Sequence, residues 1–150
     1  MGNICRSPAG ENVFRDLVDK AGLSNSIRCD SAGTLGNHIG NKPDARMSRT
    51  IRKRGYEVTG TARQFSLRDF EIYDLILTMD DENFANIIKL AKTDEDRDRV
   101  RKFTDFCTDH DESEVPDPYY GGDAGFELVA DLIEDGSAGL LAHIRKKWSL

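Results

Sequence analysis

The sequence predicts an α/β protein in which a parallel β-sheet is covered by helices on both faces. Two patterns alternate along the chain: segments with apolar residues at helical spacing, and short apolar runs that suit strands. The run YDLILTM at 73–79 is short and mainly apolar, as expected of a strand buried on both sides in a parallel sheet. Strands that alternate with helices favour parallel crossover connections over hairpins.

The first predicted element is a helix over residues 8–21. Apolar side chains recur at helical spacing after Pro8, whose ring suits the first turn of a helix, and Gly22 ends the run. Residues 27–31 predict a short strand that leads into a glycine-rich loop over 31–36.

A second helix follows Pro43 and ends at Gly55, and the strand at 73–79 comes next. The acidic residues 80–82 suit the first turn of a further helix through about Leu90, because negative charge stabilises a helix N-terminus. A loop and a helix N-terminus therefore follow this strand, at the edge of the sheet where α/β proteins bind ligands.

A weaker strand is predicted around 100–106, followed by the loop DHDESEVPDPYYGG and a long helix over about 123–147 with a weak point at Gly136. The charged stretch 92–102 indicates the solvated end of a helix. No repeat, linker or low-complexity tract interrupts the pattern, so we interpret residues 1–150 as a single domain.

Composition excludes several classes of protein. A net charge of −6 argues against broad contact with nucleic acid or a lipid surface, and the apolar runs are too short to cross a membrane. The three cysteines, Cys5, Cys29 and Cys107, are an odd number without the spacing of a metal site. We therefore expect a reducing, cytoplasmic setting and no structural metal.

The opening stretch MGNICRSP has the residues of an anion-binding loop at the start of a helix. Gly2 and Asn3 tolerate unusual backbone angles that let successive N–H groups converge on an anion, and Arg6 is a charged, two-pronged donor suited to phosphate. Ser7 adds a hydroxyl. The alternative is plainer: Ser7 and Pro8 cap the helix and Arg6 is a solvated charge.

Five segments, GNICRSP, DSAGT, ARQF, LILTMD and PDPYYGG, follow one another at a spacing that resembles the low-molecular-weight protein tyrosine phosphatases over nearly the whole chain. The resemblance implies a four-stranded parallel sheet with helices on both faces. In that family the first strand is central, and it would lie immediately before this sequence. The resemblance thus implies a single phosphatase-like domain that is truncated at its N-terminus.

The family signature is a cysteine, five further residues, then arginine and serine or threonine. With Arg6 as that arginine, the nucleophilic cysteine would stand one residue before Met1. Cys5 matches the second cysteine of the loop, which can pair with the nucleophile and protect it from oxidation. We therefore expect Met1 to be an internal methionine with the first strand upstream; a natural truncation is the alternative.

The resemblance implies hydrolysis through a phosphocysteine. The phosphate would be held by the Arg6 guanidinium and the loop over 2–7. Asp117 would protonate the leaving phenolate and later accept a proton from water. From the residues alone, Asp117 is equally an ordinary turn residue between prolines. The loop residues implied to bind phosphate are Gly2, Asn3, Ile4, Cys5, Arg6 and Ser7.

Supporting residues carry over from the same resemblance. Asn3 and Ser31 match a hydrogen-bonded pair that fixes the phosphate loop, and Ser7 matches the hydroxyl that stabilises the thiolate. Asp80 matches an acidic residue that braces the site from behind, although an acid after a strand also suits plain helix capping.

The walls of the cleft are implied to come from two loops. Tyr119 and Tyr120 match the aromatic wall beside a phenyl phosphate, and Asn37, with His38, falls where many relatives carry the opposite aromatic wall. Gly60 and Thr61 stand where many relatives have a histidine, so a supporting hydrogen bond is expected to be lost.

The sequence leaves three functions open. The first is a phosphatase for phosphotyrosine proteins or small phosphomonoesters, working without a cofactor as a monomer or weak dimer. The second is a catalytically dead oxyanion-binding module, which is what this chain would be as written. The third is an arsenate reductase of the same fold, which would need a later pair of cysteines where this chain has Cys107 alone.

Overall fold

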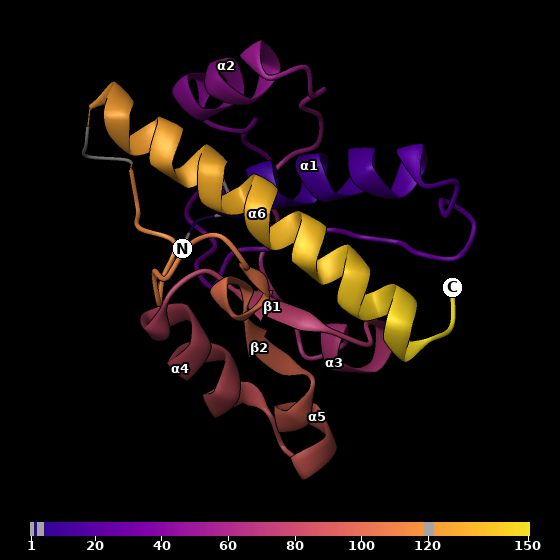
Figure 1. The fold of residues 1–150 in the computed structure, drawn as a ribbon. Coiled ribbons are helices and arrows are strands. Elements are labelled where there is room, and N and C mark those ends of the chain that lie inside the picture. Colours follow the sequence, from indigo (N-terminus) through magenta and orange to yellow (C-terminus); the bar gives the residue numbers. More distant parts are fainter. Residues whose placement is uncertain (1, 3–4, 119–121) are drawn as a thin grey trace.

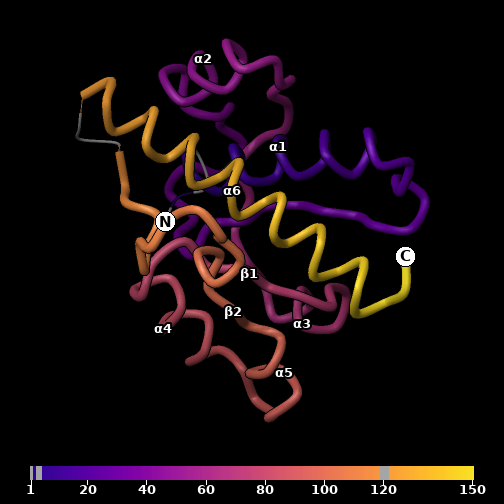
Figure 2. Tube along the Cα trace, in the orientation of Figure 1, coloured from indigo at the N-terminus to yellow at the C-terminus, as the bar shows by residue number. Residues whose placement is uncertain are grey.

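The computed structural model describes residues 2, 5–118 and 122–150. Helices α1, α2 and α6 lie on one side of a small sheet, and α4 and α5 lie on the other (Figure 1). The Cα trace shows α6 running diagonally across the molecule, with the C-terminus beyond its last turn (Figure 2). In chain order the elements are α1 (Arg6–Lys20), α2 (Ala45–Lys53), α3 (Asp69–Ile72), β1 (Ile76–Thr78), α4 (Asp81–Leu90), α5 (Asp94–Asp98), β2 (Val100–Lys102), the 3-10 helix η1 (Phe103–Phe106) and α6 (Asp123–Lys147).

The sheet is parallel, as predicted, but it is smaller than the expected four strands. Within the described residues it consists of β1 and β2, paired in register with Ile76 opposite Val100 and Thr78 opposite Lys102. A further parallel bridge joins Gly33 to Gln64.

The strand predicted at 27–31 is not formed in the described structure, and that prediction is wrong as stated. A strand exists only where a neighbour completes its backbone hydrogen bonds. In the described structure, residues 27–31 and β1 both line a cavity, and residues 27–31 pair with no strand there. The runs at 73–79 and 100–106 do form strands, but these shorten to β1 and β2, and η1 follows β2 directly.

The predicted helices are confirmed, with small shifts at their ends. The helix predicted over 8–21 begins at Arg6, so Pro8 lies in its first turn, where a missing N–H costs nothing. Asp44 caps α2 by accepting hydrogen bonds from the N–H groups of Arg46 and Met47. The helix over 123–147 continues without a break through Gly136.

The largest core cluster lies where α1, α2 and α6 meet. Val13, Met47 and Ile51 pack there against the buried face of α6, which includes Phe126 and Ile133. Burial of this kind stabilises each large side chain by about 1.5–3 kcal/mol.

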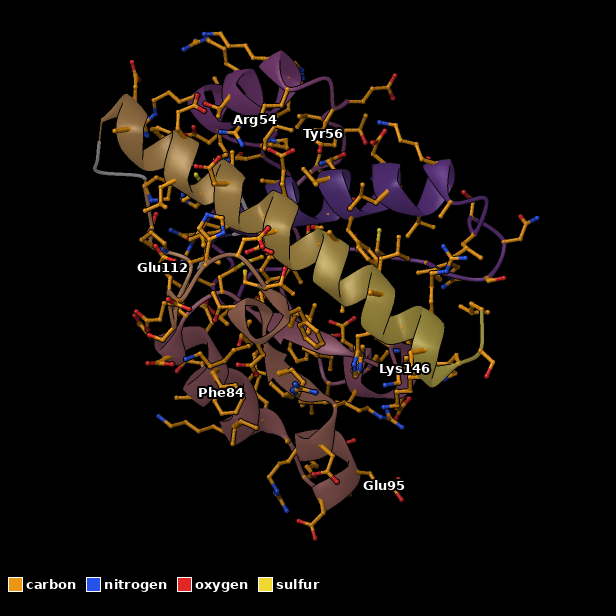
Figure 3. All side chains as sticks on the ribbon, in the orientation of Figure 1. Arg54, Tyr56, Phe84, Glu95, Glu112 and Lys146 are labelled. Carbon is orange, nitrogen blue, oxygen red and sulfur yellow. The ribbon has the colours of Figure 1, made fainter. Side chains whose placement is uncertain are left out.

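An ion cluster closes the edge of the α2–α6 contact. The Arg54 guanidinium, just after α2, donates to Glu127, Asp131 and Glu134 on α6. The Tyr56 hydroxyl donates to Glu134 at 2.8 Å, and Figure 3 shows Arg54 and Tyr56 beside α6. Burial raises the pKa of Tyr56 to about 12, with a further contribution from the hydrogen bond to Glu134.

Two glycines let α6 approach η1 closely. A Cβ at Gly136 would overlap the Phe103 ring, and a Cβ at Gly139 would overlap the backbone carbonyl oxygen of Phe106. No helix in the described part of the chain is long and apolar enough to span a bilayer.

We expect Gly139→Ala to destabilise the protein by about 1–3 kcal/mol, because the backbone carbonyl of Phe106 cannot move aside as a side chain can. Chemical denaturation measures the difference. Gly125→Ala, whose Cβ would meet Pro118 at an ordinary 3.6 Å, is the control and should gain the helix preference of alanine. Equal stability of the two variants would show that the contact between α6 and η1 is looser than described.

Candidate functional site

Arg6 is the centre of the site. It is the first residue of α1, and its side chain is 4% exposed. Its Nη1 donates to Asp80 Oδ2 at 2.7 Å and to the backbone carbonyl of Val115 at 2.7 Å. One guanidinium thus joins the start of α1, the end of β1 and the loop before α6.

Asp80 has both of the roles that the sequence left open. Its Oδ2 accepts from Arg6, and its Oδ1 accepts from the N–H of Asn83 at 2.7 Å, which caps α4. Because its two oxygens serve different partners, the position of Arg6 is coupled to the N-terminus of α4.

The loop over 107–118 is tied down before it reaches Asp117. The Val115 N–H donates to the Met79 carbonyl at 2.7 Å, which fixes the loop to the end of β1. The Thr104 hydroxyl donates to the Ser113 carbonyl at 2.9 Å, and Glu114 accepts from the N–H of Asp81 at 2.8 Å. The loop therefore has several anchors within a few residues of the predicted acid.

The base of the same loop is anchored to α6 through Asp135. This carboxylate is 5% exposed and accepts from the N–H groups of Thr108 and Asp109 and from His110. Burial opposes its ionisation, but these hydrogen bonds outweigh burial and hold the pKa of Asp135 at about 2. The hydrogen bond to Asp135 raises the pKa of His110 above its ordinary value.

Asp117 lies beside Arg6, as the sequence predicts. Its Oδ2 is 3.9 Å from Arg6 Nη2, and its side chain is 40% exposed while Arg6 is buried. A buried arginine at the start of a helix can hold an oxyanion such as a phosphate ester. A solvent-facing carboxylate beside it can exchange a proton with an ester oxygen of that ligand.

Cys5 lies in the loop but is not poised as a nucleophile. It is 7% exposed and packs in the core cluster of α1, α2 and α6. Burial raises the pKa of its thiol to about 12, with a further contribution from Asp44 and Asp117. Burial likewise raises the pKa of Cys29 to about 11 and that of Cys107 to about 12. All three cysteines therefore stay protonated near neutral pH.

The loop after the glycine-rich segment reaches the site. A side chain at Gly2 would overlap the His38 ring and come within 3.3 Å of Asn37 Oδ1. Asn37 and His38 therefore lie against Gly2, and the absence of a side chain at Gly2 allows their close approach.

Ser31 has a partner that the sequence did not suggest. Its hydroxyl donates to Glu11 Oε1 at 2.6 Å, and the Glu11 carboxylate also pairs with Arg15. The predicted partner Asn3 lies outside the described residues, as do Ile4, Tyr119 and Tyr120. Ser7 is described and half-buried at the edge of the cavity, next to Arg6.

Some structural residues of the site were missed. Asn12, 5% exposed, bonds both the carbonyl and the N–H of Thr59, which attaches the segment after α2 to α1. Asp69, a residue that is 4% exposed, receives two hydrogen bonds from Arg63 on its carboxylate, at 3.0 and 3.2 Å. The sequence could have indicated Asn12, because it is a polar residue inside the apolar face of a helix. It could not have indicated Val115, which acts through its backbone groups.

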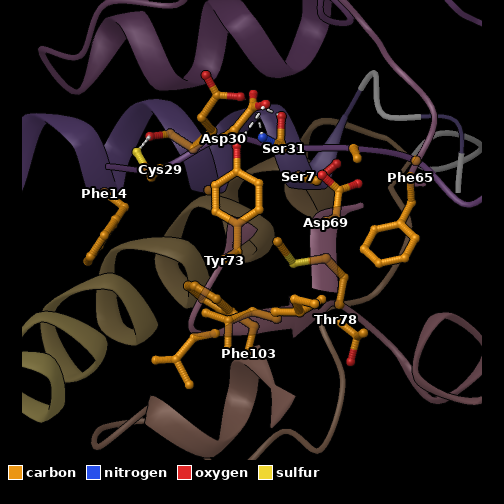
Figure 4. Close-up of a pocket in the computed structure, with 18 of the residues that line it drawn as sticks. Ser7, Phe14, Cys29, Asp30, Ser31, Phe65, Asp69, Tyr73, Thr78 and Phe103 are labelled. Atoms are coloured by element: carbon orange, nitrogen blue, oxygen red, sulfur yellow. Dashed lines mark hydrogen bonds between the residues drawn. The ribbon is translucent and has the colours of Figure 1, made fainter. Parts of the chain in front are cut away.

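A cavity of about 750 Å³ opens from the site into the molecule. Its lining includes Gly2, Ser7 and Asp117 from the site and also Trp148 and Leu150 near the C-terminus. In Figure 4, Phe14 and Cys29 lie on the α1 side and Thr78 and Phe103 on the opposite side. Figure 4 also shows Tyr73 pointing across toward Asp30, whose Oδ2 its hydroxyl meets at 3.5 Å. Among the described residues, no cluster of His, Cys, Asp or Glu is arranged to hold a metal ion.

Comparison with known proteins identifies what the chain is similar to. The model of a family described as low molecular weight phosphotyrosine protein phosphatase matches residues 1–150. The Bacillus subtilis low molecular weight protein-tyrosine-phosphatase YfkJ is 42% identical over 151 residues, spanning 100% of this chain and 95% of that protein. The human low molecular weight phosphotyrosine protein phosphatase is 38% identical over 129 residues, spanning 86% and 82%. A protein tyrosine phosphatase structure from Entamoeba histolytica matches with a TM-score of 0.95 at 37% identity, covering 98% of this chain and 94% of that one.

Because Asp80 has two partners, we expect two substitutions at this position to lower the free energy of unfolding by different amounts. Asp80→Asn can keep the cap on α4, but its amide NH₂ then faces the Arg6 guanidinium, and a broken buried pair costs about 3–5 kcal/mol. Asp80→Ala also loses the cap, at about 1 kcal/mol more. Denaturation curves measure both losses.

Thr93→Ala, which removes the exposed cap of α5, is the matched control and should cost about 1 kcal/mol. If Asp80→Asn is as stable as the unchanged protein, the hold of Asp80 on Arg6 is not an important interaction.

Proposed function

We propose, since this chain belongs to the low molecular weight phosphotyrosine protein phosphatase family, that its site is built to hydrolyse phosphotyrosine and related aryl phosphomonoesters through a phosphocysteine intermediate. One observation supports this most directly: the buried Arg6 is held at the start of α1 with the Asp117 carboxylate 3.9 Å away. An anion-binding donor and an exposed carboxylate are the two groups of the reaction that this chain supplies.

In the first step a cysteine thiolate attacks phosphorus in line with the leaving phenolate. The phosphorus–sulfur bond forms as the phosphorus–oxygen bond breaks, and Asp117 gives its proton to the phenolate. Arg6 and the backbone N–H groups of the loop stabilise the three equatorial oxygens, where charge is held during transfer. Donors that are already fixed, as Arg6 is by Asp80 and Val115, add most to this stabilisation.

In the second step water attacks the phosphocysteine. Asp117, now ionised, accepts a proton from that water, inorganic phosphate forms, and the thiolate is released. Arg6 holds the same oxygens throughout. The aryl group of the substrate would lie beside Asn37, and the resemblance assigns Tyr119 and Tyr120, which are outside the described residues, to its other wall.

The nucleophile of this reaction is proposed to stand one position before Met1. Each of the three cysteines in the chain has a raised pKa, and Cys5 is packed in the core. We propose that residues 1–150 alone bind the phosphate group and do not turn it over. The four-stranded sheet of the family is proposed to be complete when a strand precedes that nucleophile.

The chain of residues 1–150 is expected to hydrolyse phenyl phosphate at the background rate, because an acid and oxyanion donors without a nucleophile complete half of the chemistry. Phosphate release measures this rate, and Cys5→Ser should leave it unchanged. Robust turnover that Cys5→Ser abolishes would identify Cys5 as the nucleophile and contradict the proposal.

In a chain extended before Met1 by a short apolar strand and a cysteine, Asp117→Asn is expected to lower kcat by about 10²–10⁴-fold, the usual contribution of a positioned general acid. The loss should be larger for phenyl phosphate than for p-nitrophenyl phosphate, since nitrophenolate leaves without much help from an acid. Asp111→Asn, an exposed acid in the same loop, is the control. An unchanged rate in Asp117→Asn would remove this residue from the mechanism.

A further inference from the structure

We propose that His110 and Asp135 form a protonation-dependent latch, which holds the base of the loop that carries Asp117 on α6 and so positions that carboxyl group at the site. We call latch the hydrogen bonds that Asp135 accepts from Thr108, Asp109 and His110. The closing of the latch rests on the structure, whereas its effect on Asp117 as an acid rests on the proposed function.

The chain that leads from η1 into this loop lies along one side of α6. A Cβ at Gly136 would overlap the Phe103 ring, and the Cys107 thiol donates to the Leu132 carbonyl at 3.6 Å. Residues three and four apart are neighbours on the surface of a helix, so Leu132, Asp135 and Gly136 share this side of α6. Asp135 therefore meets the chain directly after Cys107, where the loop begins.

Three consecutive residues converge on the Asp135 carboxylate. Its Oδ1 accepts from the N–H of Thr108 at 2.9 Å, and its Oδ2 accepts from the N–H of Asp109 at 3.0 Å and from His110 Nδ1 at 2.7 Å. The side chain of Asp135 is 5% exposed and that of His110 is 29% exposed. A carboxylate withdrawn from water depends on such donors, so the loss of one leaves negative charge poorly compensated.

His110 is placed among acidic groups. Asp135 and Asp131 act on it from α6, and Glu112 acts on it from its own loop. Asp131 is already paired with Arg54 at 2.9 Å, so Asp135 is the direct partner. The hydrogen bond to Asp135 raises the pKa of His110, and the charges of the three carboxylates add to this rise.

The pH range of the latch follows from its two ionisable groups. Asp135 has a pKa of about 2, so it stays ionised throughout the neutral range. Because the pKa of His110 is raised by folding, its contribution is fully present below about 6.5 and is lost as the pH rises through the folded value. The two backbone N–H donors remain above that pH, without the positive charge. The latch therefore weakens on the alkaline side of neutrality but does not open fully.

The latch is close to Asp117 along the chain. His110 precedes Val115 by five residues, and the Val115 carbonyl accepts from Arg6 two residues before Asp117. Val115 is also fixed to the Met79 carbonyl through its N–H, a contact that does not titrate. The loop thus has a permanent attachment at Val115 and a titratable one at its base. Weakening the base lets the loop move about Val115, so Asp117 spends less time beside a ligand on Arg6.

The first test follows the latch in the chain of residues 1–150 and needs no turnover. In an NMR titration the His110 imidazole should have a pKa above about 6.5, and Asp135→Asn should lower it. Hydrogen-exchange protection of the Thr108 and Asp109 amides should fall by about two- to five-fold between about pH 6 and pH 8.5, as expected for a partly exposed ion pair. In His110→Gln the protection should be low at both pH values.

His143 on α6 provides the matched control, because its titration has the opposite sign. Its ring packs on Phe106 with the centroids 5.1 Å apart, and burial lowers its pKa, with contributions from Arg101 and Lys147. Its contribution to stability is therefore lost as the pH falls. His143→Gln should leave the exchange of the loop amides unchanged. Relative to the unchanged protein, His110→Gln should cost more stability at about pH 6 than at about pH 8.5, and His143→Gln should show the reverse.

The effect on Asp117 is measured with phenylphosphonate, which binds without turnover. An anion held by Arg6 beside a carboxylate favours uptake of a proton, because the two negative groups repel each other. Calorimetric titration at about pH 6 in buffers of different ionisation enthalpy measures this uptake. The difference between the unchanged protein and Asp117→Asn isolates the part due to Asp117. That difference should be smaller when both proteins also carry His110→Gln.

Each outcome decides one part of the account. A His110 pKa at or below about 6.5, or loop protection that responds neither to pH nor to His110→Gln, overturns the latch and leaves the phosphatase proposal intact. An undiminished Asp117-dependent proton uptake in His110→Gln overturns the positioning of Asp117. Absence of phenylphosphonate binding overturns the proposed function, and the exchange data still decide the latch. If Asp135→Asn does not fold, the His110 pKa of the unchanged protein and the exchange in His110→Gln give the same decision.

Discussion

The structure depends on the interactions of one buried cation. Arg6 is 4% exposed, and a buried guanidinium is tolerable only when its donors are satisfied. Its partners are Asp80 at the end of β1 and the carbonyl of Val115 in the loop before α6. The same contacts that satisfy the charge bring three separate parts of the chain together. The fold and the site therefore depend on the same residue. Arg6, which would bind phosphate, also fixes the positions of α1, α4 and the loop over 107–118 relative to one another.

The rest of the molecule divides into a packed half and an open half. Around α1, α2 and α6 the core is closed, with Val13, Ile51 and Leu132 fully buried and with α6 in direct contact with η1 across two glycines. Around β1 the apolar residues are half-buried and border a cavity of about 750 Å³. The site is thus held by a closed core on one side and borders a cavity on the other.

Much of the fold and part of the candidate site could be predicted from the sequence. The features that could not be predicted have physical causes. Helices were predictable because apolar spacing, Pro8 and the caps Asp44 and Asp80 are local signals. The strand at 27–31 was not, because strand formation depends on a neighbour that local sequence does not report. In the site, the family resemblance named Arg6, Asp80 and Asp117, which lie together in the structure, whereas the Ser31–Glu11 hydrogen bond and the backbone anchor at Val115 depend on tertiary contacts that local sequence does not report.

The central claim is that the anchored Arg6 makes a phosphate site in this chain. Calorimetric titration with phenylphosphonate, which cannot be hydrolysed, tests it most directly in the unchanged protein, Arg6→Lys and the distant Arg49→Lys. The account predicts saturable binding that Arg6→Lys weakens by about tenfold or more, the loss of a charged hydrogen bond, while Arg49→Lys changes nothing. Equal affinity for Arg6→Lys and the unchanged protein, with both folded, would contradict it.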